Sequence, residues 1–117
     1  MSKASTSVLV FGVYLIGMGA GLLFMPDFVL GTLGFAPSND IWVRVVGVLA
    51  LLLAFYYISA SRSSVTAFME WTVTGRVGIF IVFVLFVVFG WVGPIMIGLG
   101  VVDLLGALWT RSALKAG

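Results

Sequence analysis

Four long apolar stretches limit what this chain can fold into more than any other feature of its sequence. A helix that crosses a bilayer needs roughly 20 consecutive, mostly apolar residues. Stretches of about that length lie at residues 8–25, 41–60, 65–90 and 93–110, and the longest break between them, residues 26–40, holds two prolines and two aspartates. The spacing therefore predicts four membrane-spanning helices, joined by one outer loop and two short turns.

The composition agrees with this interpretation. Of the 117 residues, 62% are hydrophobic and only 9% are charged, which is too little charge to cover the surface of a soluble domain of this size. We therefore predict an all-α integral membrane protein. Residues 1–117 are expected to form a single membrane domain, an antiparallel up-down bundle of four transmembrane helices.

The residue types present exclude most catalytic and metal chemistry. Cysteine and histidine are both absent, so the chain alone cannot build a disulfide, a zinc or haem site, a thiol nucleophile or a Ser-His pair. Four carboxylates are too few for a carboxylate-bridged di-metal centre. The net charge of +2 reflects a scarcity of acids, so nucleic-acid binding has no support. We expect no catalytic residue, no metal and no cofactor other than a bound quinone or lipid.

The charges also predict how the chain crosses the membrane. With the N terminus inside, five basic residues and one acidic residue lie on the inner side, against one basic and two acidic residues on the outer side. Inner loops of membrane proteins carry an excess of lysine and arginine, so both termini are predicted to be cytoplasmic. The tryptophans, which favour membrane interfaces, fit the same arrangement, with Trp42 and Trp91 outside and Trp71 and Trp109 inside.

Three charged residues inside the apolar stretches are candidates for a buried polar cluster or ligand site. Asp103 lies near the middle of the last span, where a carboxylate costs about 2.5–3.5 kcal/mol unless it faces a protein interior. A helical rise of 1.5 Å per residue brings Arg76 within reach of it, and Arg44 is a weaker candidate partner. Because a neighbouring arginine favours the ionised form of an acid, the pattern favours a structural ion pair over proton transfer, and both interpretations stay open.

Further polar residues are expected at the inner interface, and several glycines are expected to let helices pack closely. Glu70 should lie near Arg62 or Arg111 there. Small residues in spans allow two helix backbones to approach each other, and the candidates for helix packing are Gly17, Gly21, Gly100 and Gly106.

The layout resembles the DoxX-like group of small four-helix bacterial membrane proteins. The matching residues are Pro26, the segments Trp42-Val-Arg44-Val-Val-Gly47 and Tyr56-Tyr57-Ile-Ser-Ala-Ser-Arg62, Trp71-Thr-Val-Thr-Gly-Arg76, and Val102-Asp-Leu-Leu-Gly-Ala-Leu-Trp-Thr110. The resemblance implies a four-helix fold and matching polar positions at Arg44, Arg76 and Asp103. The group is associated with membrane components of thiol and sulfur redox systems that deliver electrons to quinone. Because this chain has no cysteine, thiol chemistry would have to come from a partner.

The leading functional hypothesis is a non-catalytic membrane protein, either an accessory subunit or a module that binds a hydrophobic small molecule such as a quinone or lipid. The alternative is a small proton- or ion-coupled transporter that acts as a dimer, and the third is a membrane enzyme. The expected partners are the lipid bilayer and a membrane protein or a second copy of the chain. The expected location is the bacterial inner membrane.

Overall fold

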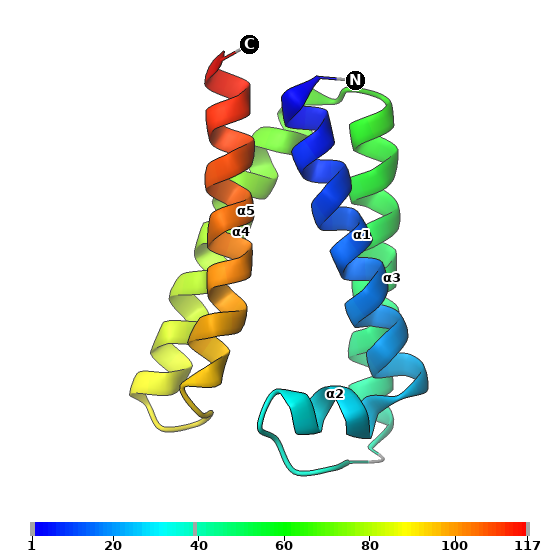
Figure 1. Cartoon of the computed structure of the whole chain (residues 1–117), viewed down its shortest axis with the longest axis vertical. Coiled ribbons are helices and arrows are strands. Elements are labelled where there is room, and N and C mark those ends of the chain that lie inside the picture. The colour runs from blue at the N-terminus through cyan, green and yellow to red at the C-terminus, as the bar shows by residue number, and fades with distance from the viewer. Residues whose placement is uncertain (1, 39, 117) are drawn as a thin grey trace. The chain divides into compact units, whose positions relative to one another are not determined.

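The computed structural model describes residues 2–38 and 40–116, and within these ranges it is all-helical. The helices are, in chain order, α1 (Lys3–Phe24), α2 (Pro26–Thr32), α3 (Ile41–Arg62), α4 (Thr66–Val88) and α5 (Ile95–Ala116) (Figure 1). Four of them, all except α2, are long and apolar enough to cross a membrane. The predicted all-α fold with four long apolar helices is therefore confirmed.

Two helices extend beyond the apolar stretches that predict them. α1 begins at Lys3, five residues before the predicted start, because Ser2 accepts a hydrogen bond from the backbone N–H of Ser5 at 3.1 Å and so satisfies a free donor of the first turn. α5 continues to Ala116, six residues past the predicted end. The predicted outer loop also contains a short helix, α2, which starts with Pro26 at its first position.

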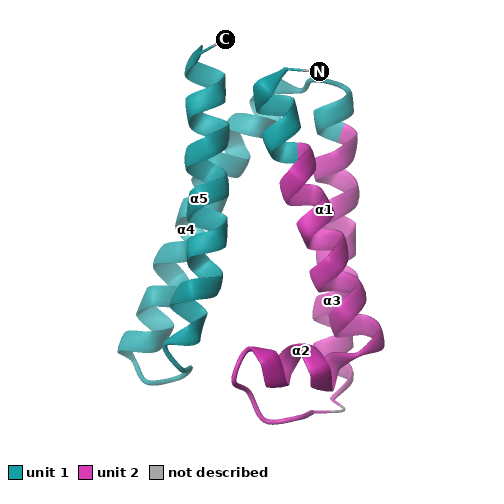
Figure 2. Cartoon of the chain, in the orientation of Figure 1, with its two compact units in different colours: residues 1–8, 60–117 teal, residues 9–59 magenta. Residues whose placement is uncertain are grey.

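The chain forms two compact units, which are coloured separately in Figure 2. Residues 9–59 make up one unit, with most of α1, α2 and most of α3. Residues 1–8 and 60–117 make up the other, with the start of α1, the end of α3, α4 and α5. We call them the α1–α3 unit and the α4–α5 unit.

In the α1–α3 unit two antiparallel helices touch through glycine. A Cβ atom built on Gly19 would lie 2.8 Å from the carbonyl oxygen of Gly47, and one built on Gly47 would lie 2.7 Å from the carbonyl oxygen of Gly19. These distances are shorter than side chains tolerate, so only glycine fits at either position. The close approach falls at Gly19, whereas a Cβ at Gly17 would meet no atom within 4 Å. Gly21 lies against Val29 of α2, at 2.7 Å by the same measure.

In the α4–α5 unit the two helices pack antiparallel along their length. A Cβ on Gly100 would lie 3.3 Å from the rings of Phe80 and Phe83, so this predicted packing glycine receives two aromatic side chains of α4. Gly106, the other predicted packing glycine, is half-buried on α5. The turn between the helices uses Gly90, whose φ is +76°, a conformation that glycine adopts without steric cost.

The turn between α3 and α4 uses a serine in the same left-handed conformation. Ser64 has φ +53°, and Val65 N–H donates to the carbonyl of Ala60 at 3.0 Å, as at the end of a helix that finishes with a Schellman motif. The residue before α4 is Val65, which forms no side-chain capping bond. Ser64 instead terminates α3.

Replacing Ser64 with glycine should stabilise the protein by about 0.5–1 kcal/mol, because glycine removes the steric cost of a positive φ. The matched control is Ser63→Gly, where φ is not positive and glycine adds only unfolded-state entropy. Thermal unfolding in detergent followed by circular dichroism measures both. Equal shifts in the two variants would contradict the strain assigned to Ser64.

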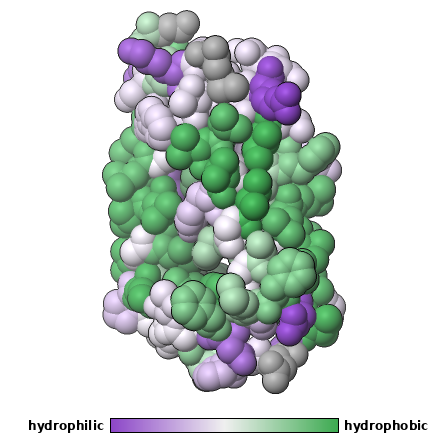
Figure 3. Space-filling model, turned by 45° about the vertical axis from the view of Figure 1, so that its right-hand side comes forward, coloured by the Kyte–Doolittle hydropathy of each residue, from purple (hydrophilic) through white to green (hydrophobic). Residues whose placement is uncertain are grey.

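The outer surface of the long helices is apolar, as a lipid-facing surface requires. Large hydrophobic side chains such as Val13, Phe55, Ile81 and Leu105 are 53–63% exposed. Figure 3 shows hydrophobic residues over most of the middle of the face in view, with strongly hydrophilic residues near its two ends. Exposing these side chains to water would be unfavourable, whereas in a bilayer they face acyl chains. The fold is that of a multi-pass membrane protein.

Candidate functional site

Arg76 is the most deeply buried charged residue among those that the structure describes. It lies in the first half of α4 and is 2% exposed. Its Nε donates to the carbonyl of Thr72 at 3.2 Å, and its Nη2 donates to the hydroxyls of Thr72 at 3.1 Å and Thr110 at 2.9 Å. Helical side chains lean towards the N terminus of their own helix, which directs this arginine back along α4 and onto the end of α5.

The hydrogen bonds continue from Thr110 to α1. The hydroxyls of Thr110 and Ser7 are 2.7 Å apart although the residues are 103 positions apart in sequence. Ser7 uses its one proton to donate to the carbonyl of Ala4 at 2.7 Å, so Thr110 is the donor to Ser7. Thr72 likewise donates to the carbonyl of Met69 at 2.8 Å.

Each of the three hydroxyl groups of Ser7, Thr72 and Thr110 therefore has a known acceptor for its proton. In each of these hydrogen bonds the donor is the group nearer to the guanidinium. We call Ser7, Thr72, Arg76 and Thr110 the buried polar network; they are between 0% and 7% exposed. Bonds that point in one direction strengthen one another, and in a medium of low dielectric each is worth more than at a surface. The network ties the starts of α1 and α4 to the end of α5.

Asp103 is half-buried on α5 and interacts electrostatically with Arg76. The sequence predicts an ion pair between this arginine and Asp103, whereas the hydrogen bonds described above go to Thr72 and Thr110. The contact of Gly100 with Phe80 places Arg76 and Asp103 at nearly the same level of the two helices. Since the helices are antiparallel, the Cα–Cβ bonds of the two residues tilt in opposite directions from that level.

Arg44, the third charged residue of the predicted cluster, belongs to the α1–α3 unit. Its Nη1 donates to the carbonyl of Leu23, one residue before α1 ends. The last carbonyls of a helix have no partner within the helix and carry partial negative charge, so an arginine there is favourable. Arg44 has a structural task in that unit, as a cap of α1.

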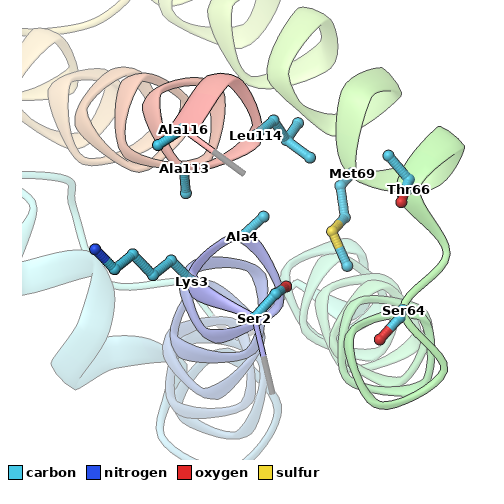
Figure 4. A pocket seen from close by; sticks show the side chains of 9 residues that line it. All are labelled: Ser2, Lys3, Ala4, Ser64, Thr66, Met69, Ala113, Leu114 and Ala116. Atoms are coloured by element: carbon cyan, nitrogen blue, oxygen red, sulfur yellow. The ribbon is translucent and has the colours of Figure 1, made fainter.

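A pocket opens at the end of the α4–α5 unit where both chain termini lie. We call it the terminal pocket; its volume is about 450 Å³. Figure 4 shows its lining residues arranged around an opening between the starts of α1 and α4 and the end of α5, with the side chain of Lys3 extending away from Met69. The apolar part is Ala4, Met69, Ala113, Leu114 and Ala116, and the polar part is Ser2, Lys3, Ser64 and Thr66.

The terminal pocket lies directly above the buried polar network. Ala4 and Met69 line the pocket, and their carbonyls accept the last hydrogen bonds of the network, from Ser7 and Thr72. The floor of the pocket is thus held in place by bonds that reach Arg76. Holding these two backbone carbonyls in place favours ligand binding, because the site then loses less conformational freedom when a ligand binds.

The charged residues predicted for the inner interface lie at this same end. Glu70 and Arg111 line one surface recess between α4 and α5, of about 350 Å³. Arg62 is exposed at the last position of α3. Within the described residues, no group of three or more acidic, histidine or cysteine side chains is placed to hold a metal ion.

Comparison of the chain with family models, with curated protein sequences and with solved structures gave no match. The class of protein is therefore defined by the fold, as a multi-pass membrane protein with four long apolar helices.

Arg76 is predicted from the sequence as a site residue, whereas its hydrogen-bonding surroundings, Ser7, Thr72 and Thr110, are not. One signal is readable: Thr72 precedes Arg76 by four residues, so the two share a helix face and the arginine leans towards it. The hydrogen bond from Thr110 to Ser7 could not be predicted from the residues near either position, because it depends on how the start of α1 meets α5.

Proposed function

We propose that this chain is a non-catalytic membrane protein that binds an amphipathic small molecule, a quinone or a lipid, in the terminal pocket. The observation that carries the proposal is the lining of the pocket, which combines serine and threonine hydroxyl groups with methyl groups and a methionine. Its volume falls within the range of small-molecule sites. Such a lining suits a ligand with hydrogen-bond acceptors at one end and an apolar body at the other.

Two features of the pocket favour a head group over a whole hydrophobic molecule. Serine and threonine hydroxyls can donate to the carbonyls of a quinone ring or to the ester and phosphate oxygens of a lipid. The apolar tail of either ligand would remain among the exposed apolar side chains of the helices. The protein would then act alone or as an accessory subunit of a membrane complex.

The proposal extends to family and location. The sequence layout supports membership of the DoxX-like group, and the excess of basic residues at the end with the termini supports a cytoplasmic location for both. We accordingly place the protein in the bacterial inner membrane, with the terminal pocket at the cytoplasmic surface.

The proposal can be tested by a substitution that fills the terminal pocket with a large side chain. Ala113→Trp places an indole in the pocket, and Ala67→Trp, at an exposed position of α4 outside the lining, is the matched control. Quinones and lipids that copurify with each variant are extracted and quantified by mass spectrometry per mole of protein. We expect the parent and Ala67→Trp to retain a ligand at near-stoichiometric level and Ala113→Trp to lose about tenfold, which corresponds to about 1.4 kcal/mol. Equal retention in all three proteins, or none in the parent, would refute the proposal.

A further inference from the structure

The recess between α4 and α5 is a second site, chemically unlike the terminal pocket. Its lining is Glu70, Val73 and Thr74 of α4 and Arg111, Leu114 and Lys115 of α5, and we call it the charged recess. Each helix contributes residues at positions i, i+3 and i+4, which is the set that faces one side of a helix. One carboxylate, two cations and one hydroxyl thus face a common space of about 350 Å³.

The opposite charges of the charged recess do not neutralise each other. Among the described residues, no ion pair or side-chain hydrogen bond joins Glu70 to Arg111 or to Lys115. The space between them is available to a molecule that itself carries both signs of charge. A purely anionic ligand would pair with the two basic residues but leave Glu70 without a partner of opposite charge, and a purely cationic one would be repelled by the two basic residues.

The helix directions give this charge pattern an orientation relative to the membrane. α4 begins at the end of the unit where α5 finishes, so Glu70 lies one turn nearer the surface than Thr74. Side chains lean towards the start of their own helix. The Cα–Cβ bond of Glu70 therefore tilts outwards, towards the surface, whereas those of Arg111 and Lys115 tilt inwards, towards the level of Thr74.

The recess lies at the depth where lipid head groups are found. Trp71 follows Glu70 on α4 and Trp109 lies two residues before Arg111 on α5, and they are 69% and 45% exposed. Exposed tryptophans mark the head-group level of a bilayer. The two apolar residues of the recess, Val73 and Leu114, suit the glycerol end of a lipid.

We propose that the charged recess binds the phosphoethanolamine head group of a membrane phospholipid. The phosphate, the deeper of the two charged groups of that lipid, would accept hydrogen bonds from Arg111, Lys115 and Thr74. The ammonium group, which is farther from the acyl chains, would donate to Glu70. A choline head group has no N–H to donate, and a glycerol head group has no positive charge for Glu70.

The test compares lipids retained from a defined mixture. The protein is reconstituted in nanodiscs of equimolar phosphatidylethanolamine, phosphatidylglycerol and phosphatidylcholine, and retained lipid is measured by native mass spectrometry. We expect the parent to enrich phosphatidylethanolamine about fivefold over the other two, the value of one partly exposed ion pair. Glu70→Gln should abolish that preference, and Arg111→Gln should lower the retention of all three lipids.

The matched control is Arg62→Gln, which removes the same charge at the same end of the protein but outside the charged recess. It should retain lipid as the parent does. An unchanged lipid preference in Glu70→Gln, or equal losses in Arg111→Gln and Arg62→Gln, would overturn the proposal. Soluble phosphoethanolamine should not displace the lipid, because the acyl chains contribute to its binding; displacement would assign the recess to a soluble ligand and would likewise overturn the proposal.

Discussion

Replacing Arg76 with alanine should destabilise the protein by about 3 kcal/mol, one of the two largest effects that we expect from a single substitution. The change removes the donor of three buried hydrogen bonds, to the carbonyl and hydroxyl of Thr72 and to the hydroxyl of Thr110. It also leaves Asp103 without the positive charge that acts on it. Unfolding by sodium dodecyl sulfate in mixed micelles, followed by circular dichroism, measures the loss.

Two further variants separate the charge of Arg76 from its shape. Arg76→Lys keeps the charge, but an ammonium group cannot reproduce the planar fork that serves both threonines, so it should recover only part of the lost stability. Arg62→Ala, at an exposed arginine, should change stability by less than about 0.5 kcal/mol. If Arg76→Ala were no worse than Arg62→Ala, the buried polar network would not be what holds this end of the unit together.

The same network can be tested pairwise. Thr110→Val removes one acceptor of Arg76 and the donor to Ser7, and leaves a buried guanidinium N–H unpaired, at a cost of about 1–3 kcal/mol. Because Arg76 and Thr110 share a bond, the double variant should cost less than the two single variants added together. Additive costs would mean that the two residues do not interact.

The positions of the four long helices could be predicted because the bilayer fixes their length. An apolar run of about 20 residues has few alternatives in a chain with so little charge. The predicted third span, residues 65–90, differs from α4 by one residue at its start and two at its end. The start of α1 could not be found from hydropathy, since residues 3–7 are mostly polar, although Ser2 three residues before Ser5 is a capping signal.

The partner of Arg76 could not be predicted from the helical rise alone. The rise gives the level of each Cα atom, which is why Asp103 is the expected partner. The direction in which a long side chain leans then decides which groups it reaches, and for Arg76 that direction leads to Thr110, seven residues beyond Asp103 on α5. Once the register of two packed helices is known, the height of each Cα atom along the pair follows from the sequence. The register itself depends on how the two helices pack and cannot be read from the sequence.

The choice between Gly17 and Gly19 is a similar case. The segment Gly17-Met-Gly-Ala-Gly21 offers small residues on several faces of α1, and the sequence does not say which face meets α3. Only the packed structure distinguishes Gly19, which touches the backbone of Gly47, from Gly17, which faces open space. The sequence predicts close packing in this segment, but not the residue at which it occurs.

That distinction gives the second large expected effect. Gly19→Ala should destabilise the protein by about 1–3 kcal/mol, because the new methyl group would lie 2.8 Å from the carbonyl oxygen of Gly47 and 2.9 Å from the N atom of Leu51, and backbone atoms cannot move aside as the end of a side chain can. Gly17→Ala is the matched control, two residues away in the same helix. It should stabilise the protein by up to about 1 kcal/mol, since alanine favours the helix and nothing lies within 4 Å.

The matching substitution on α3 tests the same contact from the other helix. Gly47→Ala should cost as much as Gly19→Ala, because a Cβ there would lie 2.7 Å from the carbonyl oxygen of Gly19. Once one methyl group has forced α1 and α3 apart, the second finds the space already open. The double variant should therefore cost clearly less than the sum of the two single variants. If Gly17→Ala and Gly19→Ala had the same effect, or the two α1–α3 contacts proved additive, the direct approach of the two backbones at Gly19 and Gly47 would be disproved.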